Sequence, residues 1–262
     1  MKKIKAYERL QIARMIERPT TLDYIDKIFS NFVELHGDRV FKDDKSIIGG
    51  IGFLNKSAVT IIGIQKGKNL KENMYRNFGC PNPEGYRKAL RLMKQAEKFN
   101  RPIVCFINTS GAYCGIEAEE RGQGEAIARN LMEISKISVP IISIIIGEGG
   151  SGGAIALACG DRVWILENSI YSILSPEGFA SILFKDSSKS KEVAEIMGIT
   201  SYELLNHGVV EKVIKEPSGG AHKNLDLVAS SIKLELIKEF KILCKKSKET
   251  LLEERYKRFR KF

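Results

Sequence analysis

The sequence has few cysteines, no paired thiols and no long hydrophobic run. None of its five cysteines (Cys80, Cys105, Cys114, Cys159 and Cys244) belongs to a C-x-x-C pair. A structural zinc site or a disulfide framework needs clustered or paired thiols, so neither is expected. No apolar run approaches the roughly 20 residues that span a bilayer. The charged first residues also lack the apolar core of a signal peptide. These absences predict a cytoplasmic protein that binds no metal and no membrane.

Acidic residues are outnumbered by basic ones. Lys and Arg total 42 against 32 Asp and Glu, which gives a formal net charge of +10. Such a charge can attract nucleic acid, a phosphorylated cofactor or an acidic protein. The sequence has no zinc-finger spacing, no aromatic RNA-binding segment and no long Lys/Arg tract. Nucleic-acid binding is therefore not expected.

The chain shows no low-complexity linker and no short repeat, so we predict one domain over residues 1–262. Residues 1–37 are expected to form N-terminal helices. The second of these helices would begin at Thr20 or Thr21 and end at Gly37. Residues 224–262 have apolar side chains at helical spacing and are expected to form a helical C-terminal extension.

The central part alternates between strand and helix patterns. Strands are predicted over 46–54 and 57–65, followed by a helix over 82–100 with a basic outer face. Apolar runs over 101–110 and 139–146 predict buried strands, each preceded by a helix. Apolar strands that alternate with helices indicate an α/β fold with helices packed against the faces of a sheet.

The glycine-rich segment Gly147–Gly153, GEGGSGG, lies between a predicted strand and a predicted helix. It matches G-x-S-x-G, the turn that presents a serine nucleophile, here Ser151. It also matches G-x-G-x-x-G, the dinucleotide-binding turn. A serine nucleophile needs a base, and no sequence feature joins any of the three histidines to Ser151. The dinucleotide turn needs an acidic residue about 20 positions on, which Glu167 matches poorly.

A third interpretation uses the backbone of the same glycines. Adjacent glycines at the start of a helix expose N–H groups that have no intrahelical partner. Without a Cβ in the way, these donors can point at a developing oxyanion, assisted by the positive end of the helix. A structural alternative also stays open, in which the glycines allow a helix and a strand to pack closely.

Several separate segments resemble the α subunit of bacterial acetyl-CoA carboxylase carboxyltransferase. The likeness runs from about Gln11 to Asn224 and includes HGDRVFKDDKSIIGGIG, RNFGCPNPEGYRKALRLMKQAEKF, NTSGAYCGIEAEERG, GEGGSGGAIAL, YSILSPEGFASIL and EPSGGAHKN. The resemblance implies a crotonase fold, in which repeated ββα units form a superhelix.

The resemblance also implies the activity and the partners. The chain would act with a β subunit that carries a zinc ribbon, as an α2β2 assembly. It would transfer the carboxyl group of carboxybiotin to acetyl-CoA, giving malonyl-CoA for fatty acid synthesis. The biotin would be carried by the biotin carboxyl carrier protein and not bound covalently here. A separate biotin carboxylase would complete the wider complex.

The resemblance assigns site residues as well. Gly152 and Gly153 would donate backbone N–H groups to the ureido oxygen of biotin, and Gly153→Val is expected to abolish transfer without changing the fold. Further wall residues of the pocket would be Gly111, Ala112, Gly115, Ile116, Gly149 and Gly150.

Residues 108–115, which contain the wall residues Gly111, Ala112 and Gly115, depart from the usual family sequence, D-T-P-G-A-Y-P-G. The chain has Asn108, Ser110 and Cys114 in place of the Asp and the two prolines. Loss of two prolines is expected to loosen the loop. For the Cys114 side chain, a role in packing is favoured over a role as a reactive thiol.

Two other functions stay open. One is a stand-alone crotonase-type acyl-CoA hydratase or decarboxylase, which would need a carboxylate base facing the thioester. The other is a serine hydrolase that depends on Ser151. The basic side chains of the helix over 82–100 could attract coenzyme A phosphates or an acidic carrier protein, or could form a solvated face.

Overall fold

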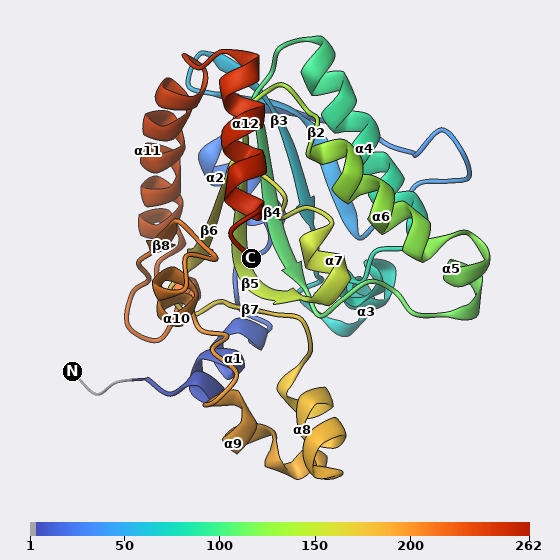
Figure 1. Ribbon diagram of the computed structural model, residues 1–262, viewed down its shortest axis with the longest axis vertical. Coiled ribbons are helices and arrows are strands. Elements are labelled where there is room, and N and C mark those ends of the chain that lie inside the picture. The colour runs from blue at the N-terminus through green and yellow to red at the C-terminus, as the bar shows by residue number, and fades with distance from the viewer. Residues whose placement is uncertain (1–3) are drawn as a thin grey trace.

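The structure, a computed structural model, describes residues 4–262, so residues 1–3 of the predicted N-terminal segment lie outside the described residues. One mixed sheet has helices on both faces (Figure 1). The strands are β1 (Ser30–Glu34), β2 (Ile47–Leu54), β3 (Ser57–Ile64), β4 (Ile103–Thr109), β5 (Ile141–Gly150), β6 (Arg162–Leu166), β7 (Ile170–Ser172) and β8 (Lys212–Ile214).

The helices are α1 (Ala6–Arg14), α2 (Thr21–Ile28), α3 (Leu70–Tyr75), α4 (Pro83–Lys98), α5 (Ile116–Glu120), α6 (Gln123–Ile134), α7 (Ser151–Ile155), α8 (Pro176–Phe184), α9 (Ser190–Ala194), α10 (Ser201–Asn206), α11 (Leu225–Leu243) and α12 (Lys248–Phe259). Three 3₁₀ turns join them: η1 (Asn77–Gly79), η2 (Ser187–Lys189) and η3 (Ala221–Lys223). No helix within residues 4–262 is both long enough and apolar enough to cross a membrane.

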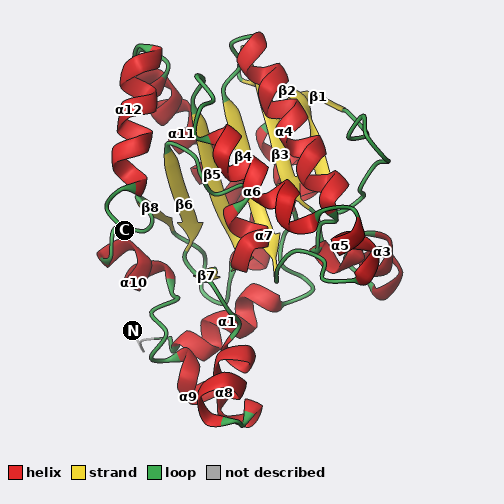
Figure 2. Ribbon diagram, turned by 45° about the vertical axis from the view of Figure 1, so that its right-hand side comes forward, coloured by secondary structure: helices red, strands yellow, loops and turns green. Residues whose placement is uncertain are grey.

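The sheet has the strand order β1-β2-β3-β4-β5-β6-β8, and β7 pairs with the end of β5. β2 is antiparallel to its neighbours β1 and β3, whereas the pairs from β3 to β8 are parallel. Every residue of β4 and β5 is buried, as the unbroken apolar runs predict. Because β4 and β5 are parallel, their carboxyl ends meet at one edge of the sheet, beside α1 and α7 (Figure 2).

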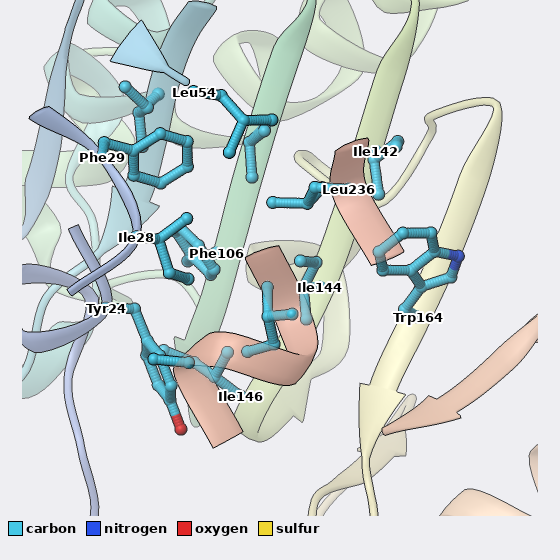
Figure 3. Close-up of a cluster of buried hydrophobic side chains, with 14 of the residues drawn as sticks. Tyr24, Ile28, Phe29, Leu54, Phe106, Ile142, Ile144, Ile146, Trp164 and Leu236 are labelled. Carbon is cyan, nitrogen blue, oxygen red and sulfur yellow. The ribbon is translucent and has the colours of Figure 1, made fainter. Parts of the chain in front are cut away.

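The side chains of β4 and β5 alternate between two hydrophobic layers. Phe106 and Ile144 point to the face that α2 and α11 cover, where Tyr24, Leu236 and Trp164 complete the layer (Figure 3). The opposite layer lies under α4, α6 and α7. Its main members are Ile62, Leu92, Met93, Ile107, Ile134, Ile145, Ala154 and Leu157.

The helix predicted from Thr20 to Gly37 is shorter than expected. Thr20 caps it in a reciprocal box with Asp23, but the helix ends at Ile28. Residues Ser30–Glu34 then form β1, which pairs with β2 at the edge of the sheet. The prediction for 29–37 was wrong because a free edge of the sheet offers this segment backbone partners that its local pattern does not reveal.

The prediction that α4 has a basic outer face is also wrong for the first half of the helix. Lys88 is fully buried, and its Nζ lies 2.6 Å from Oδ1 of Asp43 and 2.7 Å from the carbonyl oxygen of Asp44. Arg87 and Arg91 bind Asp38 and the carbonyl oxygen of Gly37. These cations hold the loop before β2, so they are not free for a phosphate or for an acidic partner.

The C-terminal segment folds back onto the sheet as α11 and α12. Arg255 of α12 is only 1% exposed and binds both carboxylate oxygens of Asp161, each at 2.9 Å. Its remaining donors reach the carbonyl oxygens of Ile134, Ile137 and Val139. This residue therefore fastens α12 to the segment that connects α6 to β5.

Candidate functional site

The glycine-rich segment forms the junction between β5 and α7. Gly150 ends the strand, and Ser151 begins the helix with a φ of +52°, in the left-handed region that most residues avoid. The chain therefore reverses from strand to helix with no loop between them. This sharp turn lies at the carboxyl edge of the parallel strands, where α/β proteins place their ligands.

Two glycines of the turn are required by close backbone contact. A Cβ at Gly150 would lie 2.2 Å from the carbonyl oxygen of Ser110, and a Cβ at Gly153 would lie 2.5 Å from the amide nitrogen of Ala112. Real side chains cannot approach backbone so closely, so these positions fix the turn against the loop that follows β4. The structural alternative for the glycines therefore accounts for part of the motif. The expectation that Gly153→Val leaves the fold intact is wrong.

Gly152 differs from these two glycines. A Cβ at residue 152 would meet only the side chain of Ile127, at 3.7 Å, which is ordinary contact. Packing therefore does not require a glycine here. The first N–H groups of α7 receive no side-chain cap, since the N-cap residue is Gly150. The N–H groups of an uncapped helix start can donate hydrogen bonds to a ligand oxygen, and the space beside Gly152 leaves room for one.

The loop after β4 supplies the neighbouring wall. Gly111 and Ala112 lie directly against Gly153. The hydroxyl of Thr109 accepts the N–H of Gly111 at 3.0 Å, and Gln123 donates to the carbonyl oxygen of Tyr113 at 2.7 Å. These bonds hold the loop in place of the two missing prolines.

The other predicted wall residues have different surroundings. Gly149 and Gly150 are buried in β5 where it pairs with β7, so they support the turn and do not line an open surface. Gly115 packs on the ring of Tyr113. Ile116 begins α5 and is 80% exposed. None of the described contacts joins Gly115 or Ile116 to the turn.

The three departures in this loop have separate consequences. Asn108 is buried, and its Oδ1 accepts the N–H of Glu148 at 3.1 Å, a role that an aspartate could also fill. The hydroxyl of Ser110 lies 3.4 Å from the sulfur of Cys80. Cys114 is exposed, so the packing role favoured for it is wrong. By contrast, burial raises the pKa of the Cys105 thiol to about 12, which leaves it protonated.

The structure does not support the two side-chain interpretations of the motif. Ser151 is exposed at a strained turn, as a nucleophile would be, yet none of the three histidines is hydrogen bonded to it in the described part of the chain. Glu167 accepts the hydroxyl of Tyr202 at 2.6 Å and the N–H of Glu216 at 3.0 Å. A carboxylate engaged in this way is not available to a ribose.

A groove of about 800 Å³ lies beside the turn. Its lining is mostly apolar and comes from α7, from β7 and the residue after it, from α10 and the loop that follows it, and from Phe262. The lining residues are Ser151, Gly152, Ile155, Tyr171, Ser172, Ile173, Leu204, Val209 and Phe262. No acidic residue and no histidine belongs to this described lining.

Glu148, which precedes the glycine turn, forms ion pairs that have no signal in the sequence. Glu148, which is 4% exposed, accepts two hydrogen bonds from Nε of Arg14, both at 3.2 Å, and one from Nη2 at 2.7 Å. Lys66 lies 3.9 Å from the same carboxylate. Burial lowers the pKa of Lys66, although Glu148 opposes that shift. The two members of the pair are far apart in the sequence, so no local pattern could have joined Arg14 to Glu148.

No metal-binding cluster accompanies this site. Within residues 4–262, no three His, Cys, Asp or Glu side chains come together in an arrangement that could hold a metal ion.

Comparison with known proteins gives the family. The sequence model described as "Acetyl co-enzyme A carboxylase carboxyltransferase-like" matches residues 1–262. The chain belongs to this family. The acetyl-coenzyme A carboxylase carboxyl transferase subunit alpha of Clostridium acetobutylicum is 60% identical to it, over 97% of this chain and 93% of that protein.

A second relative joins two subunits in one chain. The Clostridium tetani protein named for carboxyl transferase subunits beta/alpha is 60% identical over 98% of this chain. The chain spans 45% of that protein, about half of its length. This chain therefore matches one part of the longer β/α polypeptide of Clostridium tetani.

The predicted fold class is confirmed. Transcarboxylase 12S superposes on this chain with a TM-score of 0.71 at 18% sequence identity. The superposition covers 90% of this chain and 44% of the transcarboxylase chain. At so low an identity the likeness shows the fold alone, which is the α/β crotonase-like fold of carboxyltransferases.

Proposed function

We propose that this chain is the α subunit of an acetyl-CoA carboxylase carboxyltransferase. Together with a β subunit, it would move the carboxyl group from carboxybiotin on a carrier protein to acetyl-CoA, giving malonyl-CoA. Membership of the family and 60% identity to the Clostridium acetobutylicum α subunit support this activity. Residues 1–262 would act as one domain whose working edge is the carboxyl end of β4 and β5.

The observation that carries the proposal is the turn at Gly152. Its N–H group lies at an uncapped helix start, beside open space and an apolar groove. Carboxybiotin supplies the carboxyl group, and negative charge develops on its ureido oxygen when that group leaves. Fixed N–H donors aimed at such an oxygen lower the barrier by about 3 kcal/mol for each donor in other enzymes. Gly152 and Gly153 would be these donors.

The walls of the pocket would come from both loops. Gly111 and Ala112 lie against Gly153 and would border the ureido end of the biotin. Gly149 and Gly150 would hold the turn from inside the sheet. Gly115 and Ile116 would border the entrance, where Ile116 is exposed. The apolar groove suits a ring system that brings few charges of its own.

A β partner would cover the apolar surface of α8. Ile182, Leu183 and Phe184 are 62%, 57% and 45% exposed, and Ile173, on the connection from β7, is 84% exposed. Exposed apolar side chains gathered in this way mark interaction sites. Ile173 also lines the groove, so the surface is continuous with the proposed pocket. The Clostridium tetani β/α chain supports a β partner for this carboxyltransferase chain.

The alternative of a stand-alone acyl-CoA hydratase or decarboxylase lacks a base. Such an enzyme needs a carboxylate that faces the thioester, and the described lining of the groove contains none. The nearby carboxylates of Glu148 and Glu177 are both bound by Arg14. The groove therefore favours a reaction in which the chain supplies backbone donors and no general base.

The test is an assay of malonyl-CoA-dependent carboxylation of biocytin, with this chain alone and with a β subunit. We expect turnover only when both chains are present. Turnover of acyl-CoA by this chain alone, without any biotin compound, would show that the proposal is wrong. Labelling of Ser151 by a fluorophosphonate would instead support the serine hydrolase.

A further inference from the structure

Arg14, the last residue of α1, joins two carboxylates from distant parts of the chain. Its Nη2 binds Oε1 of Glu148 on β5 at 2.7 Å, and its Nη1 binds Oε1 of Glu177 on α8 at 2.7 Å. The two hydrogen-bonded acids raise the pKa of Arg14 far above its usual value, although burial opposes this shift. The guanidinium therefore stays charged and can bind both acids at once.

The Glu148 end of this bridge is part of the strand that carries the glycine turn. The Glu148 side chain is only 5% exposed, and its residue lies just before Gly149, Gly150 and Ser151. Its N–H donates to Asn108 on β4, and its backbone pairs with Ile170 on β7. Glu148 is therefore held next to the turn both through its backbone, by β4 and β7, and through its carboxylate, by Arg14.

The Glu177 end lies on the helix with the proposed docking surface. Glu177 is in the first turn of α8, whose later residues Ile182 and Leu183 are exposed. α8 also follows β7, which pairs with Gly149 and Gly150. α8 is thus joined to the strand end twice, through the β7 ladder and through Arg14. In Figure 1, α1 lies between the sheet edge and the α8 and α9 helices.

We propose that Arg14 is a positioning residue that couples the docking of a partner on α8 to the geometry of the Gly152 turn. This inference rests on the proposed function, because it needs a partner on α8 and a reaction at the turn. A partner that shifts α8 moves Glu177, and the rigid guanidinium fork passes this displacement to Glu148. A lysine at residue 14 could not do the same, because a single ammonium group lacks the planar fork that holds two carboxylates.

If the bridge were purely structural, loss of Glu177 would lower the thermal midpoint together with kcat. The coupling predicts a loss of kcat alone. The Arg14–Glu177 pair is 31% and 40% exposed, and pairs of this kind contribute little to folding. Loss of Glu177 should therefore leave the thermal midpoint unchanged. Any effect on turnover at saturating partner and substrate then reports the geometry of the turn, since a docking contact alone would change only the affinity for the partner.

The experiment compares Glu177→Gln, Arg14→Lys and the double variant in the complex with the β subunit. A matched control is Glu253→Gln, which breaks an exposed pair with Lys257 on α12. We expect Glu177→Gln to lower kcat by roughly 5- to 10-fold, the lower end of coupling between sites. KM and the thermal midpoint should stay constant, and the partner affinity should change by no more than the same factor, because the coupling of docking to the turn is reciprocal. Arg14→Lys should give the same loss, and the double variant should be no worse than either single variant.

The outcomes separate this inference from the proposed function. A wild-type complex without transfer would overturn both. If the wild-type complex is active and Glu177→Gln keeps its kcat, only the coupling is overturned. The coupling is also overturned if Glu177→Gln weakens partner affinity alone, lowers the thermal midpoint along with kcat, or has no more effect than Glu253→Gln.

Discussion

The backbone of Gly153 lies directly against the backbone of Ala112, so that a Cβ at residue 153 would come within 2.5 Å of the Ala112 amide nitrogen. This contact joins the two loops that border the groove, one after β4 and one after β5. It also separates two roles that the glycine motif combines. Gly153 is needed for packing whatever its N–H does, whereas Gly152 has room for a side chain.

Gly152→Ala therefore tests the donor site without disturbing the fold. The added methyl group fits at 3.7 Å from Ile127 but takes up space beside the N–H group. We expect carboxyl transfer to fall by at least tenfold while the thermal midpoint stays the same or rises, because alanine favours a helix by about 1 kcal/mol over glycine. Gly124→Ala on α6 is the control, since a Cβ there meets nothing within 4 Å. Full activity of Gly152→Ala would argue against an oxyanion site at this turn.

Gly153→Ala should instead lower stability. Its Cβ would force the loop of Gly111 and Ala112 away from the turn. Overpacking of this kind typically costs about 1–3 kcal/mol. Urea unfolding of the isolated chain measures this cost, and an unchanged midpoint would mean that the two loops separate easily. Loss of activity in this variant cannot by itself assign a donor role to Gly153.

Ser151→Ala should keep most of the transfer activity. The hydroxyl has no histidine bonded to it in the described structure, and the proposed reaction uses backbone donors. Ser151→Gly should in addition raise the unfolding free energy slightly, because the φ of +52° strains a serine but not a glycine. Steady-state kinetics and thermal melts of both variants check these outcomes. A loss of three orders of magnitude in Ser151→Ala would restore the serine as nucleophile.

The sequence predicted the sheet well where burial is continuous. The strands of 101–110 and 139–146 contain long runs of apolar residues, and the structure has β4 and β5 there. Prediction failed at 29–37, where a segment with helical spacing pairs with the free edge of β2. It failed at Lys88 as well, because its partner Asp43 is distant in the sequence and lies in a loop with no pattern of its own.

The place of the candidate site in the fold could be predicted because its signal is local. The glycines are contiguous, and they lie between a strand and a helix that local patterns reveal. The contact between Gly153 and Ala112 and the bridge from Arg14 to Glu148 depend on segments that only the folded chain brings together. Gly152 and Gly153 therefore looked equivalent in the sequence, and the structure distinguishes them.

The pair of Lys88 and Asp43 predicts a dependence on pH. Burial alone would raise the pKa of Asp43, but hydrogen bonds from Lys88, Gly37 and Lys45 lower it well below its usual value of 3.8. The ionised carboxylate thus stabilises the folded chain above pH 3.8, and this stabilisation is lost as the pH falls toward the lowered pKa. The buried cation of Lys88 makes the loss large.

Asp43→Asn should lower the unfolding free energy at pH 7 by about 3–5 kcal/mol, since it leaves a buried charge without its carboxylate. The difference from wild type should shrink as the pH is lowered from 4 to 2, because Asp43 of the unfolded wild-type chain takes up a proton below pH 3.8 while the folded carboxylate stays ionised. Asp26→Asn, at an exposed position on α2, is the matched control. A difference that stays constant over this pH range would show that the charge of Asp43 is not the cause.

Leu183→Ala should weaken binding of a β subunit. Leu183 is 57% exposed on α8, within the surface proposed for the partner. Leu234 on α11 is 58% exposed and lies outside that surface, so Leu234→Ala removes the same side chain at equal exposure. A side chain at the centre of an interface contributes more than about 1.4 kcal/mol, so we expect Kd to rise about tenfold for Leu183→Ala and to stay constant for Leu234→Ala. Titration of each variant with the β subunit measures both values. Equal affinities would place the partner elsewhere, and a selective loss in Leu234→Ala would place it on α11.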